Sequence, residues 1–349
     1  MIENDLMKYM LCLFAQQPRR ANALQYILIG KRTSSNLFAA LRYHCLSLLQ
    51  IDPNLNINYF KNSVDQLVDQ HYLRITEKGY YQLTAEGQLY QEQINLPQPT
   101  HYDGRWMRQF NLMKNVVSLS IQVISQVKHQ QHNYVPLIND LQTQWRVKHW
   151  FHQIKHFDNW QQLFVNELTL ILSKLPAKYA DLLANRFTGY QTVGLPLRQL
   201  TTFYHLSLPA MQVMVLDAWA AFWQIARQYQ QQLPLLSLLL PPVQYLTDNV
   251  AQTVTQFRDN HLSIAQISNY RHLQPSTIRE HLLEAAIITP FLLKDVHLGT
   301  AQQLQQLQEA WDNNQLCDYH PLLSSGLSFF QIRFFHIQRL TANDYNKTN

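Results

Sequence analysis

Glycine, cysteine and long apolar runs are scarce in this chain, and each shortage excludes a class of protein. Only 8 of the 349 residues are glycine, which argues against a turn-dense β protein and against glycine-rich phosphate loops. Cys12, Cys45 and Cys317 lie far apart without Cys-x-x-Cys spacing, so we expect free thiols in a reducing compartment rather than a disulfide framework or a zinc ribbon. The longest apolar run, 233–243, is short and interrupted by prolines, so we expect no membrane span.

The first residues also lack the positive charge that begins a signal peptide. Glu3 and Asp5 come first, and Lys8 interrupts the apolar stretch that follows. We therefore expect no signal peptide and predict a cytoplasmic protein, with association with the nucleoid left open.

Positive charge is concentrated in the middle of the chain. Residues 104–246 contain twelve Lys or Arg and five Asp or Glu, whereas residues 247–349 contain seven and nine, and residues 1–103 contain nine of each. Because neutralisation of phosphates dominates non-specific affinity for nucleic acid, the middle segment is the better candidate for contacts with a DNA backbone.

Leu, Gln and Ala dominate the composition, which favours helices, and we predict a mainly α fold in three domains. A winged-helix-like domain at 1–95 has helices up to 70, a small β-hairpin formed by 72–76 and 80–83, and a last helix to about 93. After a proline-containing linker, residues 104–244 form a basic helical domain with a helix-turn-helix at about 175–225. Residues 245–349 form a second helix-turn-helix domain. The winged helix either binds DNA or serves protein packing, since Asp65 and Asp69 on its recognition helix would face phosphates.

No motif for catalysis or for a cofactor is present. The segment Gly30-Lys-Arg-Thr33 lacks the first glycine of a phosphate-binding loop and the Ser or Thr directly after Lys31. His149, His152 and His156 share one helical face but have few carboxylates nearby. We predict no catalytic residues, no cofactor and no metal ion, and hence no enzyme. Aromatic residues at 145–160 are expected in the core, with base stacking as the alternative.

Two segments about 67 residues apart share the apolar spacing of a helix-turn-helix. The matching positions of the downstream segment, 262–283, are Ile267, Ser268, Leu273, Pro275, Ile278, His281 and Leu282. Those of the upstream segment, 195–216, are Leu200, Leu206, Pro209 and Met211.

The downstream turn and second helix carry side chains that helices in the DNA major groove use. We predict DNA contacts by Arg271, His272, Gln274, Ser276, Thr277 and Arg279, and in the upstream segment by Arg198 and Gln212. Two features temper this prediction. His272 occupies the turn position where glycine is usual, which strains the backbone if φ is positive, and the surrounding domain is net acidic. Docking to a protein is therefore the alternative.

Residues 175–225 resemble region 4 of bacterial sigma factors. The Leu175-Pro start, the helix that ends in Arg186-Phe187, the following loop with Gly189 and the two-helix unit occur in the same order. Leu208, Met211 and Val213 replace much of the polar character of a base-reading helix and leave Gln212 as its main exposed reader. The resemblance thus implies the fold of this segment more than promoter recognition.

The C-terminal block, Thr247 to Leu340, resembles the helicase-associated helix-turn-helix domain at the C-terminus of some RecQ-family helicases. The matching features are Leu262-Ser-Ile with Ile267, Arg271, Leu273, Ser276-Thr-Ile278, His281-Leu282 and Leu327-Ser-Phe-Phe-Gln-Ile-Arg333. The whole chain is similar to a stand-alone family of Gram-positive bacteria that lacks helicase motors and is typically encoded beside a RecQ-like helicase.

The resemblance implies a non-catalytic accessory protein in DNA repair or recombination that binds DNA, a RecQ-like helicase, or both. A sequence-specific transcription regulator and a protein-interaction scaffold without DNA binding are the alternatives. Self-association stays open.

Overall fold

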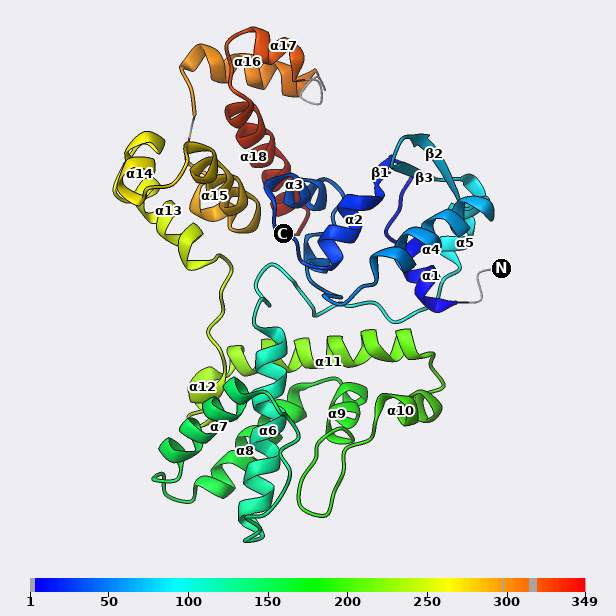
Figure 1. Ribbon diagram of the computed structural model, residues 1–349, viewed down its shortest axis with the longest axis vertical. Helices are drawn as coiled ribbons and strands as arrows, with labels where there is room; N and C mark the ends of the chain where they lie inside the picture. Colours follow the sequence, from blue (N-terminus) through cyan, green and yellow to red (C-terminus); the bar gives the residue numbers. More distant parts are fainter. Residues whose placement is uncertain (1–3, 297, 314–318, 349) are drawn as a thin grey trace. The chain divides into compact units, whose positions relative to one another are not determined.

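The structure, a computed structural model, describes residues 4–296, 298–313 and 319–348 (Figure 1). These residues form eighteen α-helices, three short 3-10 helices and a three-stranded sheet, so the prediction of a mainly α fold with a small sheet is confirmed. Cys12 and Cys45 are free thiols, and Cys317 lies outside the described residues.

The chain groups into two compact units. The first contains Met1–Cys12, Ala85–Asp103 and Met107–Val243, and the second contains Leu13–Thr84, Gly104–Trp106 and Gln244–Asn349. The second unit therefore combines a segment of the predicted winged-helix-like domain with the C-terminal helix-turn-helix domain. The division into three independently folding domains stays a prediction.

The first unit contains helices and, in the residues described, no strand beyond an isolated bridge between Gly189 and Thr192. Its helices are α1 (Asp5–Leu11), α5 (Ala85–Glu92), α6 (Phe110–Lys128), α7 (Leu141–Ile154), α8 (Trp160–Lys174), α9 (Ala177–Ala184), α10 (Leu197–Tyr204), α11 (Leu208–Gln228), η2 (Gln230–Gln232) and α12 (Leu236–Leu239).

Helix α11 is the central helix of the first unit, packed against α1, α6, α8, α9 and α10. Small and large apolar residues alternate along it, with Ala218 and Ala220 beside Trp219, and all three are buried. A helix that is apolar on most of its surface is stable only inside a core. No single described helix is long and apolar enough to cross a membrane, although α10 and α11 together, bent by 100°, have the length and composition.

The second unit contains the sheet and two groups of helices. In chain order its elements are β1 (Arg19–Arg20), α2 (Ala21–Leu28), α3 (Ser34–Arg42), η1 (Leu46–Leu48), α4 (Ile57–Asp69), β2 (Leu73–Glu77), β3 (Tyr80–Leu83), α13 (Asp248–Arg258), α14 (Ile264–Arg271), α15 (Pro275–Ile288), η3 (Pro290–Leu292), α16 (Ala301–Asp312), α17 (His320–Ser324) and α18 (Phe329–Thr348).

The sheet has the antiparallel order β1-β3-β2. Strands β2 and β3 form the predicted hairpin, with Gly79 at φ +81° in its turn, a conformation that glycine adopts without strain. Strand β1 was not predicted: its two residues, Arg19 and Arg20, pair with Tyr81 and Tyr80. The order of strand β1, helices α2 and α4 and hairpin β2–β3 is typical of a winged helix. Here α3 and η1 lie between α2 and α4.

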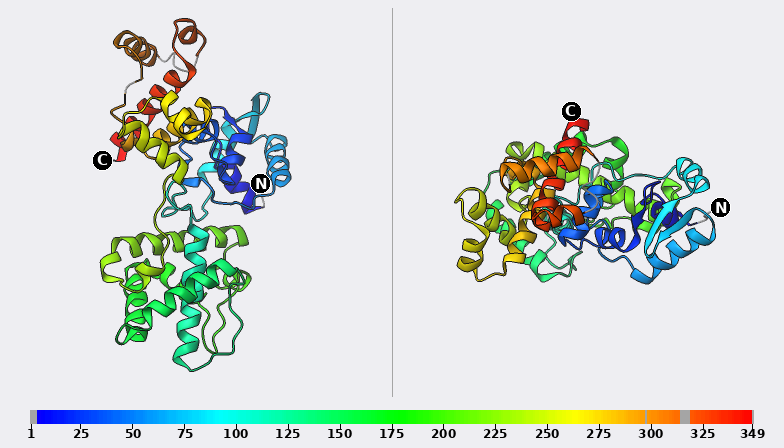
Figure 2. Two further views of the ribbon diagram at one scale, coloured as in Figure 1. Left: turned by 60° about the vertical axis from the view of Figure 1, so that its left-hand side comes forward. Right: turned by 90° about the horizontal axis from the view of Figure 1, so that it is seen from above.

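Helix α15 is the central helix of the C-terminal part, where it packs against α3, α13, α14 and α18. Figures 1 and 2 show α13 and α14 (yellow) packed with α15 (orange), and α15 beside α18 (red). From Leu282 to Thr289 every residue is buried, so this half of the helix belongs to the core of the unit.

Histidine, rather than glycine, occupies several left-handed backbone positions at helix ends. His44, His71, His205, His261 and His272 have φ between +52° and +63° and follow α3, α4, α10, α13 and α14. His272, at the turn position where glycine is usual, has φ 53°. Non-glycine residues in this region carry strain, so these turns are held by the helices that they join.

Candidate nucleic-acid interface

The C-terminal helix-turn-helix is built from α14, a short turn and α15. Ile267 of α14 and Ile278 and Leu282 of α15 are completely buried, so the predicted apolar positions form the shared face. The Ser268 hydroxyl donates to the Leu273 carbonyl across the turn, at 2.5 Å. At the start of α14, Ser263 and Gln266 form a reciprocal capping box, which satisfies two backbone donors that a helix start leaves unpaired.

A buried threonine on α13 joins this helix to both helices of the motif. The Arg271 guanidinium donates to the hydroxyl of Thr253, and to the Asn249 carbonyl at 2.9 Å. His281 Nδ1 of α15 lies 2.8 Å from the same hydroxyl. Burial and the nearby Arg271 charge lower the pKa of His281, so the neutral imidazole is favoured. Arg271, predicted as a phosphate contact, therefore also fixes α14 on α13.

The other predicted DNA contacts of this motif lie together at the start of α15. Gln274, Ser276 and Arg279 are exposed, and Thr277 is half-buried. His272 is exposed in the turn directly before them. All lie within about two turns of helix, the part of a recognition helix that contacts base edges in helix-turn-helix proteins.

The acidic side chains of α15 interact within the protein. Glu280 Oε2 accepts a hydrogen bond from the backbone N–H of Ser34, at 3.2 Å, and Ser34 is the first residue of α3. A carboxylate is favourable at this positive end of a helix. Glu284 forms an ion pair with Arg32 at 3.2 Å, and Arg32 also donates to the Tyr245 carbonyl.

The segment Gly30 to Ser35 therefore has a structural role. It binds the two carboxylates of α15 through the Ser34 N–H group and the Arg32 guanidinium. The net acidity of the C-terminal segment overstates the negative charge near Arg279, because the charge of the buried Glu284 is balanced by Arg32.

The upstream unit, α10 and α11, has the same turn. His205 lies at φ 52° after α10, and His272 lies at φ 53° after α14. The following residues, Leu206 and Leu273, both donate their N–H to a carbonyl five residues back, at 3.1 Å. The two predicted contacts of this unit, Arg198 and Gln212, are exposed. Buried residues surround Gln212 along α11, so the polar surface of this helix is small.

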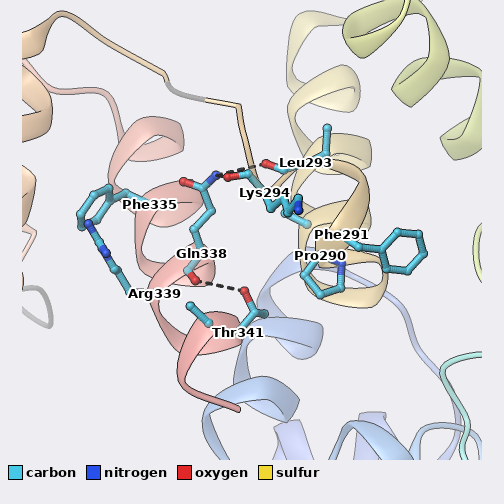
Figure 3. A pocket seen from close by; sticks show the side chains of 10 residues that line it. Pro290, Phe291, Leu293, Lys294, Phe335, Gln338, Arg339 and Thr341 are labelled. Carbon is cyan, nitrogen blue, oxygen red and sulfur yellow. Dashed lines mark hydrogen bonds between the residues drawn. The ribbon is translucent and has the colours of Figure 1, made fainter. Parts of the chain in front are cut away.

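A cavity of about 510 Å³ lies between the end of α15, η3 and α18 (Figure 3). Gln338 crosses it and donates to the carbonyls of Leu293 and Val296, at 3.1 and 2.9 Å. The Arg339 guanidinium lies over the Phe335 ring, 4.9 Å from its centroid. The Gln338 amide thus connects α18 to the end of the helix-turn-helix.

A buried aspartate in the first unit was missed by sequence reasoning. Asp217 of α11 is fully buried and accepts hydrogen bonds from the backbone N–H groups of His101 and Tyr102, at 2.7 and 2.9 Å. The hydroxyls of Thr100 and Tyr179 also donate to it. Burial raises the pKa of Asp217, but these hydrogen bonds and the His101 imidazole outweigh it, so the pKa is lowered. The predicted linker is therefore anchored at this carboxylate.

The aromatic residues of α7 differ in exposure, which corrects the expectation that they form core. Trp150 is 2% exposed, whereas Trp145 is 68% exposed. His149 and His152 are exposed on the same helix, and His156 follows it. Among the residues described, no three His, Cys, Asp or Glu side chains are placed to hold a metal ion.

Comparison with known proteins agrees with the C-terminal geometry. Residues 249–336 match a family described as a helix-turn-helix domain, which confirms the predicted C-terminal domain, suggests DNA binding and points to a non-enzymatic role. Over 333 residues the chain is 24% identical to Protein YpbB of Bacillus subtilis (strain 168), in an alignment that covers 90% of this chain and 91% of that protein. No solved structure matches.

Proposed function

We propose that this protein binds DNA through the start of α15 and acts as a non-catalytic accessory factor of a RecQ-like helicase in DNA repair or recombination. The observation that carries DNA binding is the exposed set Gln274, Ser276 and Arg279 at the start of α15, a helix that packs against α3, α13, α14 and α18. The helicase is proposed from the resemblance of the C-terminal block and of the chain as a whole.

The chemistry of this surface suits a duplex. Arg279 can pair with a phosphate or with the acceptor edge of guanine, and Gln274 can pair with adenine. Glu284 forms an ion pair with Arg32 of the α2–α3 segment, which limits its repulsion of phosphates. Arg198 and Gln212 of the upstream unit are proposed as additional contacts.

Fluorescence anisotropy of the full chain with duplex, forked and single-stranded DNA over a salt series tests the proposal. Arg279→Gln should weaken duplex binding and lower the slope of log affinity against log salt by about one, because one phosphate contact is lost. Arg258→Gln is the matched control, since Arg258 is partly exposed and paired with its neighbour Asp259 at 2.6 Å.

Undiminished binding by Arg279→Gln and by Gln274→Ala would refute a DNA interface at α15. Tight binding to one duplex sequence and not to random duplex would favour the transcription regulator instead. Co-purification of the full chain with a RecQ-like helicase, after nuclease treatment, tests the partner. Loss of the complex on nuclease treatment would mean that DNA bridges the two proteins.

A further inference from the structure

Helix α7 has one face that packs into the first unit and an opposite face that is exposed. On the packed face, Val147, Trp150 and Ile154 are buried. The Trp150 indole donates to the Leu235 carbonyl at 2.8 Å, and Arg146 donates to the Leu239 carbonyl at 3.1 Å. The exposed face consists of Leu141, Trp145, Lys148, His149 and His152, and Lys155 follows at the end of the helix.

Trp145 is the most unusual residue of this exposed face. Its indole is 68% exposed and lies parallel to the His149 ring, with centroids 5.5 Å apart and planes 8° apart. A large flat ring in water is unfavourable unless something covers it. The stacked imidazole supports one side of the indole and leaves a surface of the size that a nucleobase covers.

The charge around Trp145 is positive. Helix α7 contains no carboxylate between Leu141 and Ile154, and Lys148 is exposed one turn after Trp145. The nearest acid before the helix, Asp140, caps its first turn by accepting from the N–H and hydroxyl of Thr143, at 2.8 and 2.6 Å. Asp158 follows only after Lys155. An aromatic platform beside cations is the pattern of surfaces that bind single-stranded nucleic acid.

We propose that this face, Trp145 with Lys148, His149, His152 and Lys155, binds single-stranded DNA. An unpaired base stacks on Trp145, and Lys148 and Lys155 contact the adjoining phosphates. A duplex does not meet this chemistry, because its bases already stack on one another and offer only their edges. A polyanion is the favoured occupant because the helix presents cations without carboxylates. The site belongs to the first unit and does not depend on DNA binding by α15.

Anisotropy with labelled oligo(dT) and the full chain tests the proposal. Trp145→Ala should weaken binding about fivefold to 100-fold, the effect of losing one stacked base, whereas Trp145→Phe, which keeps an aromatic ring, should lose much less. Lys148→Glu should lower the salt slope by one or more. Lys174→Glu is the matched control, since Lys174 is an exposed lysine at the end of α8. The affinity of this variant for oligo(dT) should remain within a factor of about two of the affinity of the parent protein.

Photocrosslinking with oligonucleotides that contain 5-bromodeoxyuridine locates the contact, and the crosslinked peptide should contain Trp145. Folded Trp145→Ala protein with unchanged affinity for oligo(dT), or crosslinks confined to other segments, would overturn the proposal. Tighter binding to oligo(U) would overturn the assignment to DNA. Arg279→Gln separates the two sites: it should weaken duplex binding while single-strand affinity is retained, and Trp145→Ala should do the reverse.

Discussion

Acidification from pH 7 to pH 5 should destabilise the second unit through His336 of α18. This side chain is 5% exposed and makes edge contacts with the rings of Phe38 and Trp311, at 5.1 and 5.8 Å between centroids. Its Nδ1 has no hydrogen-bond partner within the part of the chain that the structure describes. Burial, together with the positive charges of Arg42 and Arg333, lowers the pKa of His336 to about 4.

The size of the effect follows from the two pKa values. An unfolded histidine has a pKa of about 6.5, so between pH 6.5 and 4 the unfolded chain binds a proton that the folded chain excludes. Stability therefore rises with pH through this window and is lost as the pH falls. For a single histidine with these values, the free energy of unfolding decreases by about 2 kcal/mol between pH 7 and pH 5.

Urea unfolding followed by circular dichroism at both pH values measures this loss. His336→Leu removes the ionisable group and should reduce the pH-dependent loss by about 2 kcal/mol, whatever its effect on stability at pH 7. His132→Gln, which changes an exposed histidine, should leave the loss unchanged. Equal losses in the parent protein and in His336→Leu would show that a neutral, buried His336 is not part of the folded state.

Two further predictions concern stability. Asp217→Ala should lower the free energy of unfolding by about 3–5 kcal/mol, because it leaves the buried donors of residues 100–102 and Tyr179 without their acceptor; a loss below about 1 kcal/mol in urea unfolding would contradict the anchoring role. His272→Gly should raise stability by about 0.5–1 kcal/mol, because relief of left-handed strain exceeds the entropy that glycine adds to the unfolded chain. His272→Val should lower it, and thermal unfolding of the two variants should show shifts of opposite sign.

The elements that are specified locally could be predicted from the sequence. Helices α14 and α15 follow from apolar residues at helical spacing, a proline at the second helix start and a compatible turn. The hairpin β2–β3 follows from alternation around Gly79. Strand β1 could not be found, because it has two residues and exists only through pairing with Tyr80 and Tyr81, sixty residues later in the chain.

The parts of the site that depend on tertiary contacts could not be predicted from the sequence. Trp145 and Trp150 belong to the same helix, and both faces of α7 contain apolar and basic residues, so the sequence does not tell which tryptophan is buried. Arg271 and Glu280 are typical of exposed recognition helices, yet one is bonded to α13 and the other to α3. Asp217 offered a signal that could have been used, since a lone carboxylate in an apolar helix requires partners.

The shared turn of the two helix-turn-helix units explains why they resemble each other in sequence. His205 and His272 have nearly the same backbone angles, and the next residue makes the same hydrogen bond in both. The repeated feature is thus the main-chain turn between the two helices, together with the apolar residues that pack against it. The side chains on the outer surface are not repeated: at the start of α11 the exposed Gln212 follows the buried Ala210 and Met211, whereas Ser276 and Arg279 are exposed at the start of α15. The same main-chain turn can therefore join two helix pairs whose outward-facing side chains differ.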